Sequence, residues 1–338
     1  MNLISDFIIE LGVASIWTYI VLFLAASGLM VWRLEALLKH GLDGTALGTL
    51  VMPYCSGLGN LLFVAIILRR GEPTQEVMTN CLVNNVTNLT LLLGLPALVW
   101  GLSLRGSKNA KSNRLSRSTA KGDVAQQLNR LSLLLSLAAV LFFGGVTWAL
   151  GSDGTIDRKD GAVLIAIFLF WQCFQVFDVL KQNVRERRSF RSKFYFDLLV
   201  VIAGAYVLYV SIDWLMTWLS SQKTGFISAA NLGWLSGWLM VLPNGLLECY
   251  YAAKRRADIV YASQVGDGHI CIPLCIGVAA MVRPMTLPSF FETGLITMLG
   301  AALVHVLALA FASGLPRWMG WPLAAAYGWF LSAGLFNN

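Results

Sequence analysis

Long apolar runs, most of them about twenty residues or more, follow one another through almost the whole chain. Hydrophobic residues make up 57% of the 338 residues and charged residues only 13%, whereas a soluble globular chain is about a quarter charged. An α-helix needs about 20 apolar residues to cross the hydrocarbon core of a bilayer. The sequence therefore predicts an all-α polytopic membrane protein and leaves no stretch for a separate soluble enzyme domain.

The apolar runs predict ten transmembrane helices. They lie at roughly 12–32, 44–68, 76–100, 131–150, 161–180, 195–217, 228–252, 258–282, 291–313 and 319–336. With the N-terminus outside, 19 of the 25 lysine and arginine residues fall on the inside. Because cytoplasmic loops carry the excess of basic residues, both termini are expected outside an inner or plasma membrane, with flexible cytoplasmic loops at 101–130 and 181–194. This topology explains the net charge of +7. The lipid bilayer is therefore an expected partner, and nucleic acid is not.

Two stretches of the chain are built alike. Each contains an apolar helix with glycine or proline near its middle, a short charged turn, and a second helix that is polar in its first half; the expected breaks are at Gly57, Gly59 and Pro243. The first helix runs from inside to outside in one stretch and from outside to inside in the other. Interrupted helices at matching places in two inverted halves are the best sequence pointer to a transporter binding site.

The predicted domain organisation follows from this repeat. The first five-helix repeat covers 12–181 with its core at about 44–100, and the second covers 195–337 with its core at about 228–282. A basic cytoplasmic connector at 182–194 joins them. We therefore expect two inverted five-helix repeats with broken helices at the bilayer midplane.

Polar side chains concentrate in the two cores. A helix broken inside the bilayer frees backbone groups that hydrocarbon cannot satisfy, so the break must line protein or a watery cavity, where oxygens can hold a cation. An isolated asparagine is explained by hydrogen bonding between helices, but Asn80, Asn84 and Asn88 share one helical face. The predicted cation-binding residues are Asn60, Asn80, Asn84, Asn85, Asn244, Glu248, Ser263 and Asp267.

These stretches resemble the two α-repeats of the cation/calcium antiporter superfamily, the sodium/calcium exchanger-like proteins. The family's G-N-x-x-G-S-N-x-x-N motif is matched at Asn80, Asn85 and Asn88, and its Leu-Pro-Glu step is matched by Leu242-Pro243-Asn244. The resemblance implies a secondary active cation antiporter that works by alternating access, not an enzyme. It implies no cofactor, and the transported cations are inorganic: Na⁺, Ca²⁺, K⁺ or H⁺.

The chain departs from the family at the ion-site acids. In the family a glutamate from each repeat meets the calcium ion, whereas Asn60 and Asn244 stand at those positions here. An amide offers one neutral oxygen, and affinity for hard divalent ions follows ligand charge, so an altered ion selectivity is expected. Asp267 is the strongest acidic candidate, because a carboxylate inside a membrane is costly unless it is paired or hydrated. Glu248, one turn beyond Asn244, is equally suited to the site or to neutralising the basic residues at its helix end.

Other interpretations of the same residues stay open. A transport-inactive relative with a binding or sensing role would also lose both glutamates. Val265–Gly268 faintly resembles the Gly-x-Gly-Asp signature of intramembrane aspartyl proteases, but Gln264 stands at the first glycine position. That chemistry also needs a second aspartate, and Asp178 and Asp197 near helix ends are poor candidates.

His269 is expected to be a hydrogen-bonded interface residue, with proton coupling as the alternative. Cys271 and Cys275 lie one turn apart, but a soft-metal site needs a third strong ligand, so packing is expected. The sequence leaves the oligomeric state and any metal undetermined.

Overall fold

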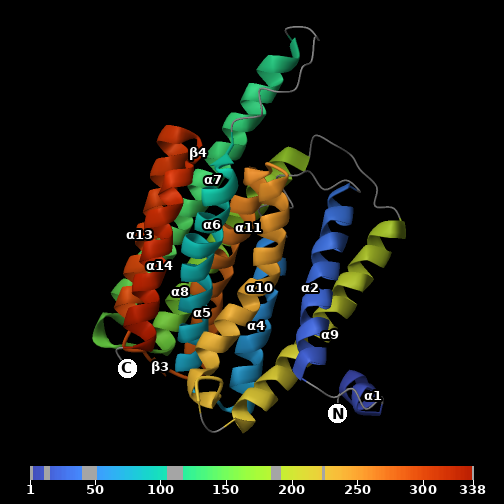
Figure 1. Ribbon diagram of the computed structural model, residues 1–338, viewed down its shortest axis with the longest axis vertical. Coiled ribbons are helices and arrows are strands. Elements are labelled where there is room, and N and C mark those ends of the chain that lie inside the picture. Colours follow the sequence, from blue (N-terminus) through green and yellow to red (C-terminus); the bar gives the residue numbers. More distant parts are fainter. Residues whose placement is uncertain are drawn as a thin grey trace.

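The computed structural model describes residues 3–10, 16–39, 52–104, 117–183, 192–222 and 225–336. The predicted loop segments 105–116 and 184–191, and the starts of two predicted helices at 12–15 and 44–51, lie outside the described residues. The described chain is a bundle of long helices that stand roughly side by side (Figure 1).

The predicted ranges all overlap helical segments of the described chain. The helices are α1 (Leu3–Glu10), α2 (Ile16–Lys39), α4 (Met52–Arg70), α5 (Gln75–Thr87), η2 (Asn88–Leu92), α6 (Leu93–Trp100), α7 (Arg117–Leu150), η3 (Gly151–Asp153), α8 (Arg158–Asn183), α9 (Ser192–Ser221), η4 (Ala229–Asn231), α10 (Leu232–Ala253), α11 (Ala257–Ile270), η5 (Cys271–Cys275), α12 (Ile276–Val282), α13 (Phe291–Leu307), η6 (Ala308–Ala312), η7 (Arg317–Met319) and α14 (Gly320–Leu335). Two short antiparallel ribbons join loops: β1 (Leu102–Ser103) pairs with β4 (Gly314–Leu315), and β2 (Thr155–Ile156) pairs with β3 (Met285–Thr286).

Within the described residues, six helical segments are long and apolar enough to cross a membrane. They are Gln75–Trp100, Gln127–Asp153, Arg158–Phe177, Leu199–Ser221, Ala257–Val282 and Phe291–Ala312. Crossing by the other predicted helices stays a prediction. The outward side chains suit a bilayer, since large apolar residues such as Phe170 and Phe177 on α8 are exposed.

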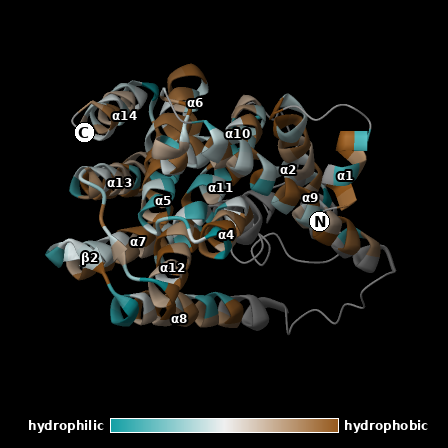
Figure 2. Ribbon diagram, turned by 90° about the horizontal axis from the view of Figure 1, so that it is seen from below, coloured by the Kyte–Doolittle hydropathy of each residue, from teal (hydrophilic) through white to brown (hydrophobic). Residues whose placement is uncertain are grey.

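Two of the helical runs form the centre of the bundle. The apolar windows of α5–α6 and α11–α12 are 72% and 78% buried, against 28% for α8. α10 packs on α5, and α11 packs on α4. Seen along the bundle, α2 and α9 lie on one flank, and α13 and α14 lie on the other (Figure 2). The central helices are therefore enclosed by protein, where polar side chains can be met by other polar groups.

Two central helix pairs, α4 with α5–α6 and α10 with α11–α12, run in opposite directions. Arg283, after α12, donates to the Gly71 carbonyl after α4 over 3.0 Å, so α4 and α12 end on the same face of the bundle. Arg255, after α10, donates to the Trp100 carbonyl at the end of α6, so α10 and α6 end on the opposite face. The pair α4 and α5 therefore enters and leaves from the face opposite to that used by α10 and α11.

The predicted helix breaks at Gly57, Gly59 and Pro243 are wrong, because α4 and α10 pass through these residues without interruption. The glycines serve close packing instead. A Cβ on Gly57 would lie 2.8 Å from the Ile270 Cβ, and one on Gly59 would lie 2.6 Å from the Met240 sulfur. Small residues let membrane helices approach closely, and a proline inside a membrane helix is tolerated when its surroundings satisfy the freed carbonyl.

The second helix of each pair contains irregular backbone, and a third π-helical segment, η6, follows α13. The π-helical segments η2 and η5 interrupt α5–α6 and α11–α12, and η5 follows η2 by 183 residues at both of its ends. In each, a backbone N–H reaches the carbonyl five residues back, Leu93 to Asn88 and Ile276 to Cys271. Single π turns inside α-helices frequently mark functional sites. The two pairs therefore share a distortion at matching positions.

The expected flexible loop at 101–130 is only partly a loop. α7 begins at Arg117, and its polar first turns extend beyond the end of the bundle (Figure 1). Ala, Gln, Leu, Lys and Arg in this stretch are good helix formers, and they continue the helix that the apolar residues require further on. Residues 102–103 form β1.

Candidate functional site

Five buried polar side chains form one hydrogen-bonded cluster between the central helices, here called the amide–carboxylate cluster. Each is at most 3% exposed. They come from α4, from α5 and the start of η2, from α10 and from α11. The members are Asn60, Asn84, Asn88, Asn244 and Asp267. Four of them, Asn60, Asn84, Asn244 and Asp267, are predicted cation-binding residues, whereas Asn88 was noted only for its helical face and its match to the family motif. The fold brings all five together from both helix pairs.

The hydrogen bonds converge on one carboxylate oxygen. Asn88 Nδ2 donates to Asn84 Oδ1 and to Asp267 Oδ2, each over 2.9 Å. Asn244 Nδ2 donates to the same Asp267 oxygen over 2.6 Å. Asn84 Nδ2 reaches Asn60 Oδ1 at 3.5 Å. The donors are neutral amides, so they hydrogen-bond the carboxyl group without bringing a positive charge to it.

Close backbone approach positions α10 against α5, which sets Asn244 beside the α5 residues. A Cβ on Gly233 would lie 2.5 Å from the Thr79 Cβ, and one on Gly237 would lie 2.8 Å from the Val83 Cβ. Glu76 Oε2 accepts a hydrogen bond from the Gly233 N–H over 2.6 Å. This contact satisfies one of the unpaired N–H groups at the start of α10.

Asn80 and Asn85 are buried on the same helix but have other partners. Asn80 Nδ2 donates to Ser236 Oγ over 3.0 Å, and Asn85 Nδ2 donates to the Cys81 carbonyl over 2.7 Å. Neither hydrogen bond connects to the amide–carboxylate cluster. Their side-chain oxygens, like that of Asn88, are buried without a hydrogen-bond partner among the described residues. They are therefore available to a cation or a water molecule.

Glu248 is buried one turn beyond Asn244, with 2% exposure. Within the part of the chain that the structure describes, neither of its carboxylate oxygens has a hydrogen-bond partner. Among the described residues Glu248 forms no ion pair, so the alternative that it neutralises a basic residue at the helix end has no support there. A buried carboxylate without partners must hold a proton or meet a cation. Ser263 is also buried.

The structure adds residues that the sequence analysis did not select. Gln264 is fully buried, and both of its side-chain polar atoms lack a hydrogen-bond partner among the described residues. Ser236 on α10 receives the Asn80 bond and donates to the Gly233 carbonyl over 3.1 Å. The same signal, a polar residue inside an apolar run, could have selected Gln264 as well.

Two histidines form hydrogen bonds between the helices around the cluster. His269 Nε2 lies 2.9 Å from the Ser136 carbonyl, and its ring meets Phe143 and Trp171 edge-on, which supports the interface interpretation. His305 on α13 places Nε2 2.7 Å from the Leu89 carbonyl in η2 and Nδ1 3.3 Å from the Tyr261 hydroxyl. With the proton on Nε2, His305 satisfies a carbonyl of the π segment and links it to α11.

Residues 11–177 match the family model described as sodium/calcium exchanger protein. Solved structures of the sodium-calcium exchanger NCX_Mj share the fold. One, soaked with 2.5 mM Na⁺ and 10 mM Sr²⁺, is 18% identical and covers 96% of this chain and 99% of its own, with a TM-score of 0.64. Another, soaked with zero Na⁺ and Ca²⁺, is 17% identical and covers 94% of this chain and 97% of its own, also with a TM-score of 0.64. No curated protein matches the sequence.

The described chain is an apolar helix bundle with segments long enough to cross a membrane, and its match to the exchanger family model makes it an integral membrane transporter and not an enzyme. The chain belongs to the cation/calcium antiporter superfamily, as a sodium/calcium exchanger-type protein. Membership makes it a cation antiporter and removes the intramembrane protease interpretation.

Proposed function

We propose that the chain exchanges cations by alternating access, and that the amide–carboxylate cluster is the ion site. One observation carries the proposal: Asp267 Oδ2, on one helix pair, accepts hydrogen bonds from Asn88 on the other pair and from Asn244 on its own. Two inverted five-helix repeats with ten membrane crossings are the architecture in which such a site rocks between the two sides of a membrane.

The ligand chemistry favours a singly charged ion. Asn60 and Asn244 supply neutral oxygens, and Asp267 supplies the carboxylate of the cluster. Because affinity for hard divalent ions rises with the number of charged ligands, Na⁺ is held more readily than Ca²⁺ by this set. Glu248 is the second carboxylate of the proposed site. It carries a proton when no cation is near and releases this proton when a cation binds, so that the proton is the exchanged ion.

The test is ion flux in proteoliposomes, with gradients of Na⁺, K⁺, Ca²⁺, Mg²⁺, Mn²⁺ or H⁺ imposed one at a time. Na⁺ uptake driven by a proton gradient is expected, and Ca²⁺ uptake is expected to be weaker. Asp267→Asn should abolish flux. Asp258→Asn, the same change on the same helix at a half-exposed ion pair with Arg256, should leave it intact.

A transport-inactive relative is the second candidate, because the glutamate positions hold asparagine and the helices α4 and α10 are unbroken. Ion binding without flux in a well-folded preparation is its signature. If no gradient drives flux but Na⁺ binding is lost in Asp267→Asn, the binding role replaces the exchange role. If neither flux nor binding depends on Asp267, the cluster is not the ion site.

A further inference from the structure

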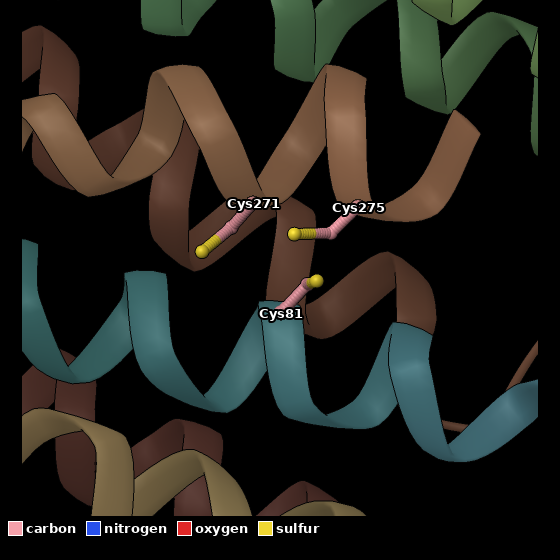
Figure 3. A group of neighbouring side chains, drawn as sticks. All are labelled: Cys81, Cys271 and Cys275. Atoms are coloured by element: carbon pink, nitrogen blue, oxygen red, sulfur yellow. The ribbon is translucent and has the colours of Figure 1, made fainter. Parts of the chain in front are cut away.

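Three buried thiols meet at one point between the two central helix pairs. Cys81 lies on α5, and Cys271 and Cys275 are the first and last residues of η5. All three residues are fully buried, and their sulfur atoms all lie within 4.8 Å of one another. In Figure 3, Cys81 approaches from one helix and the other two from the helix facing it, with the sulfurs toward the space between the helices.

This spacing fits a three-coordinate metal site. A metal–sulfur bond of about 2.3 Å places three sulfurs in a trigonal plane about 4.0 Å apart. Each pair of sulfurs therefore has to close by less than about 1 Å from the observed upper limit of 4.8 Å. Rotation about the Cα–Cβ bonds supplies such a movement. Cys81 is the third strong ligand that the pair Cys271 and Cys275 lacks in the sequence.

The π segment sets the two ligands of the facing helix. Cys271 and Cys275 begin and end η5, where the Ile276 N–H bonds the Cys271 carbonyl. Both side chains therefore leave a distorted turn on the side that faces α5, as Figure 3 shows. The thiols also adjoin the amide–carboxylate cluster, because Asn84 follows Cys81 by about one turn on α5 and Asp267 precedes Cys271 by one turn. A cation that reaches that cluster is one helical turn from the sulfurs.

Thiolate ligands select soft d¹⁰ ions such as Zn²⁺, Cd²⁺ and Cu⁺ over hard ions. In an apolar interior three isolated thiolates would be costly, so the metal-free thiols keep their protons. Binding of a divalent ion displaces three protons and leaves a complex of charge −1: M²⁺ + 3 RSH gives [M(SR)₃]⁻ + 3 H⁺. A monovalent ion would leave charge −2, so the apolar surroundings favour the divalent ion.

We propose that Cys81, Cys271 and Cys275 form a binding site for one thiophilic divalent metal ion, of the Zn²⁺ or Cd²⁺ class, that bridges the two helix pairs. The site is separate from the proposed exchange site, whose ligands are oxygens, and it does not depend on transport.

The test uses the full-length protein produced in cells grown with added Cd²⁺ and purified in detergent without chelator. Elemental analysis is expected to give one Cd²⁺ per chain, and X-ray absorption at the cadmium edge is expected to give three sulfur neighbours. Cys81→Ser, Cys271→Ser and Cys275→Ser each remove one soft ligand while nearly keeping the side-chain size. Each should lower retained Cd²⁺ at least about tenfold.

Cys249→Ser is the matched control, because Cys249 is an exposed thiol on α10 and its loss should leave the metal content unchanged. Size-exclusion profiles of all variants establish that they are folded. Wild-type protein without cadmium, or cadmium that stays after Cys81→Ser in a folded variant, would overturn the proposal. Cadmium bound through oxygen neighbours would also overturn it and would assign the ion to the amide–carboxylate cluster.

Discussion

Asn88 Nδ2 and Asp267 Oδ2 lie 2.9 Å apart although 179 residues separate them in the chain. This hydrogen bond joins the two helix pairs at the point where η2 begins. Asn88 uses its second amide hydrogen on Asn84, so both hydrogens of one side chain are committed within the cluster. A change at either residue therefore alters the contact between the pairs.

Asp267→Asn should lower cation affinity at least about tenfold, because it removes the carboxylate of a site whose other ligands are neutral. Isothermal titration of the purified protein with Na⁺ measures the effect. The control Asp258→Asn should change the affinity by less than about twofold, since exposed ion pairs contribute little. Equal losses in both variants would remove Asp267 from the site.

Asn244→Glu should raise Ca²⁺ affinity about tenfold or more, because a second carboxylate joins Asp267 and affinity for Ca²⁺ increases with ligand charge. The same change at Asn60 should act in the same direction. Ca²⁺ uptake by proteoliposomes and Ca²⁺ titration measure it. Asn129→Glu, at an exposed position on α7, adds the same charge on a helix that contributes no residue to the cluster. If it raises Ca²⁺ binding equally, general surface charge explains the effect.

Gly57→Ala should reduce the free energy of unfolding by about 1–3 kcal/mol, because an overpacked contact forces its neighbours to shift. The added methyl group would lie 2.8 Å from the Ile270 Cβ. Gly145→Ala is the control, since a Cβ there meets nothing within 4 Å and alanine is the better helix former. Thermal unfolding in detergent compares the two. A neutral Gly57→Ala variant would show that α4 and α11 can separate without cost.

Glu76→Ala should destabilise the α5–α10 contact by about 1–3 kcal/mol, because it leaves the Gly233 N–H without its acceptor. Glu76→Gln keeps an oxygen and should recover part of the loss. The thermal midpoint of unfolding reports both changes. Glu72→Ala, in the turn before α5, should have little effect. If it destabilises as much as Glu76→Ala, the hydrogen bond to α10 is not the cause.

Cd²⁺ should inhibit flux, because a metal held by Cys81 on one side and by Cys271 and Cys275 on the other ties the helix pairs together. Cys81→Ser should relieve the inhibition, and Cys249→Ser should not. Proteoliposome flux with and without Cd²⁺ measures this. Metal bound at the three sulfurs without inhibition would mean that exchange does not require the pairs to separate there.

The sequence was sufficient for the helical membrane fold and for most of the cluster, and the reasons are local. Apolar run length is set by bilayer thickness, so the helix ranges were predictable. Polar residues in such runs are costly unless they meet one another, so Asn60, Asn84, Asn244 and Asp267 could be singled out.

The local course of the backbone and the contacts between side chains of different helices could not be predicted in the same way. Gly57, Gly59 and Pro243 are weak helix formers, and propensity alone predicts breaks there, but a buried helix in an apolar surrounding keeps its hydrogen bonds because nothing else can satisfy them. The π segments have no composition signal. The three cysteines meet only through the tertiary arrangement of α5 and η5, and sequence spacing along one helix shows two of them.

The π segments also change which side chains share a face of the helix. A residue added to one turn rotates everything beyond it by about 100° relative to a straight α-helix. A helical wheel drawn through residues 75–100 or 257–282 therefore assigns wrong faces to the final two turns of each. Deleting one residue inside η2 or η5 would swing those turns by more than a quarter of a circle, and side chains that now face protein would turn toward lipid.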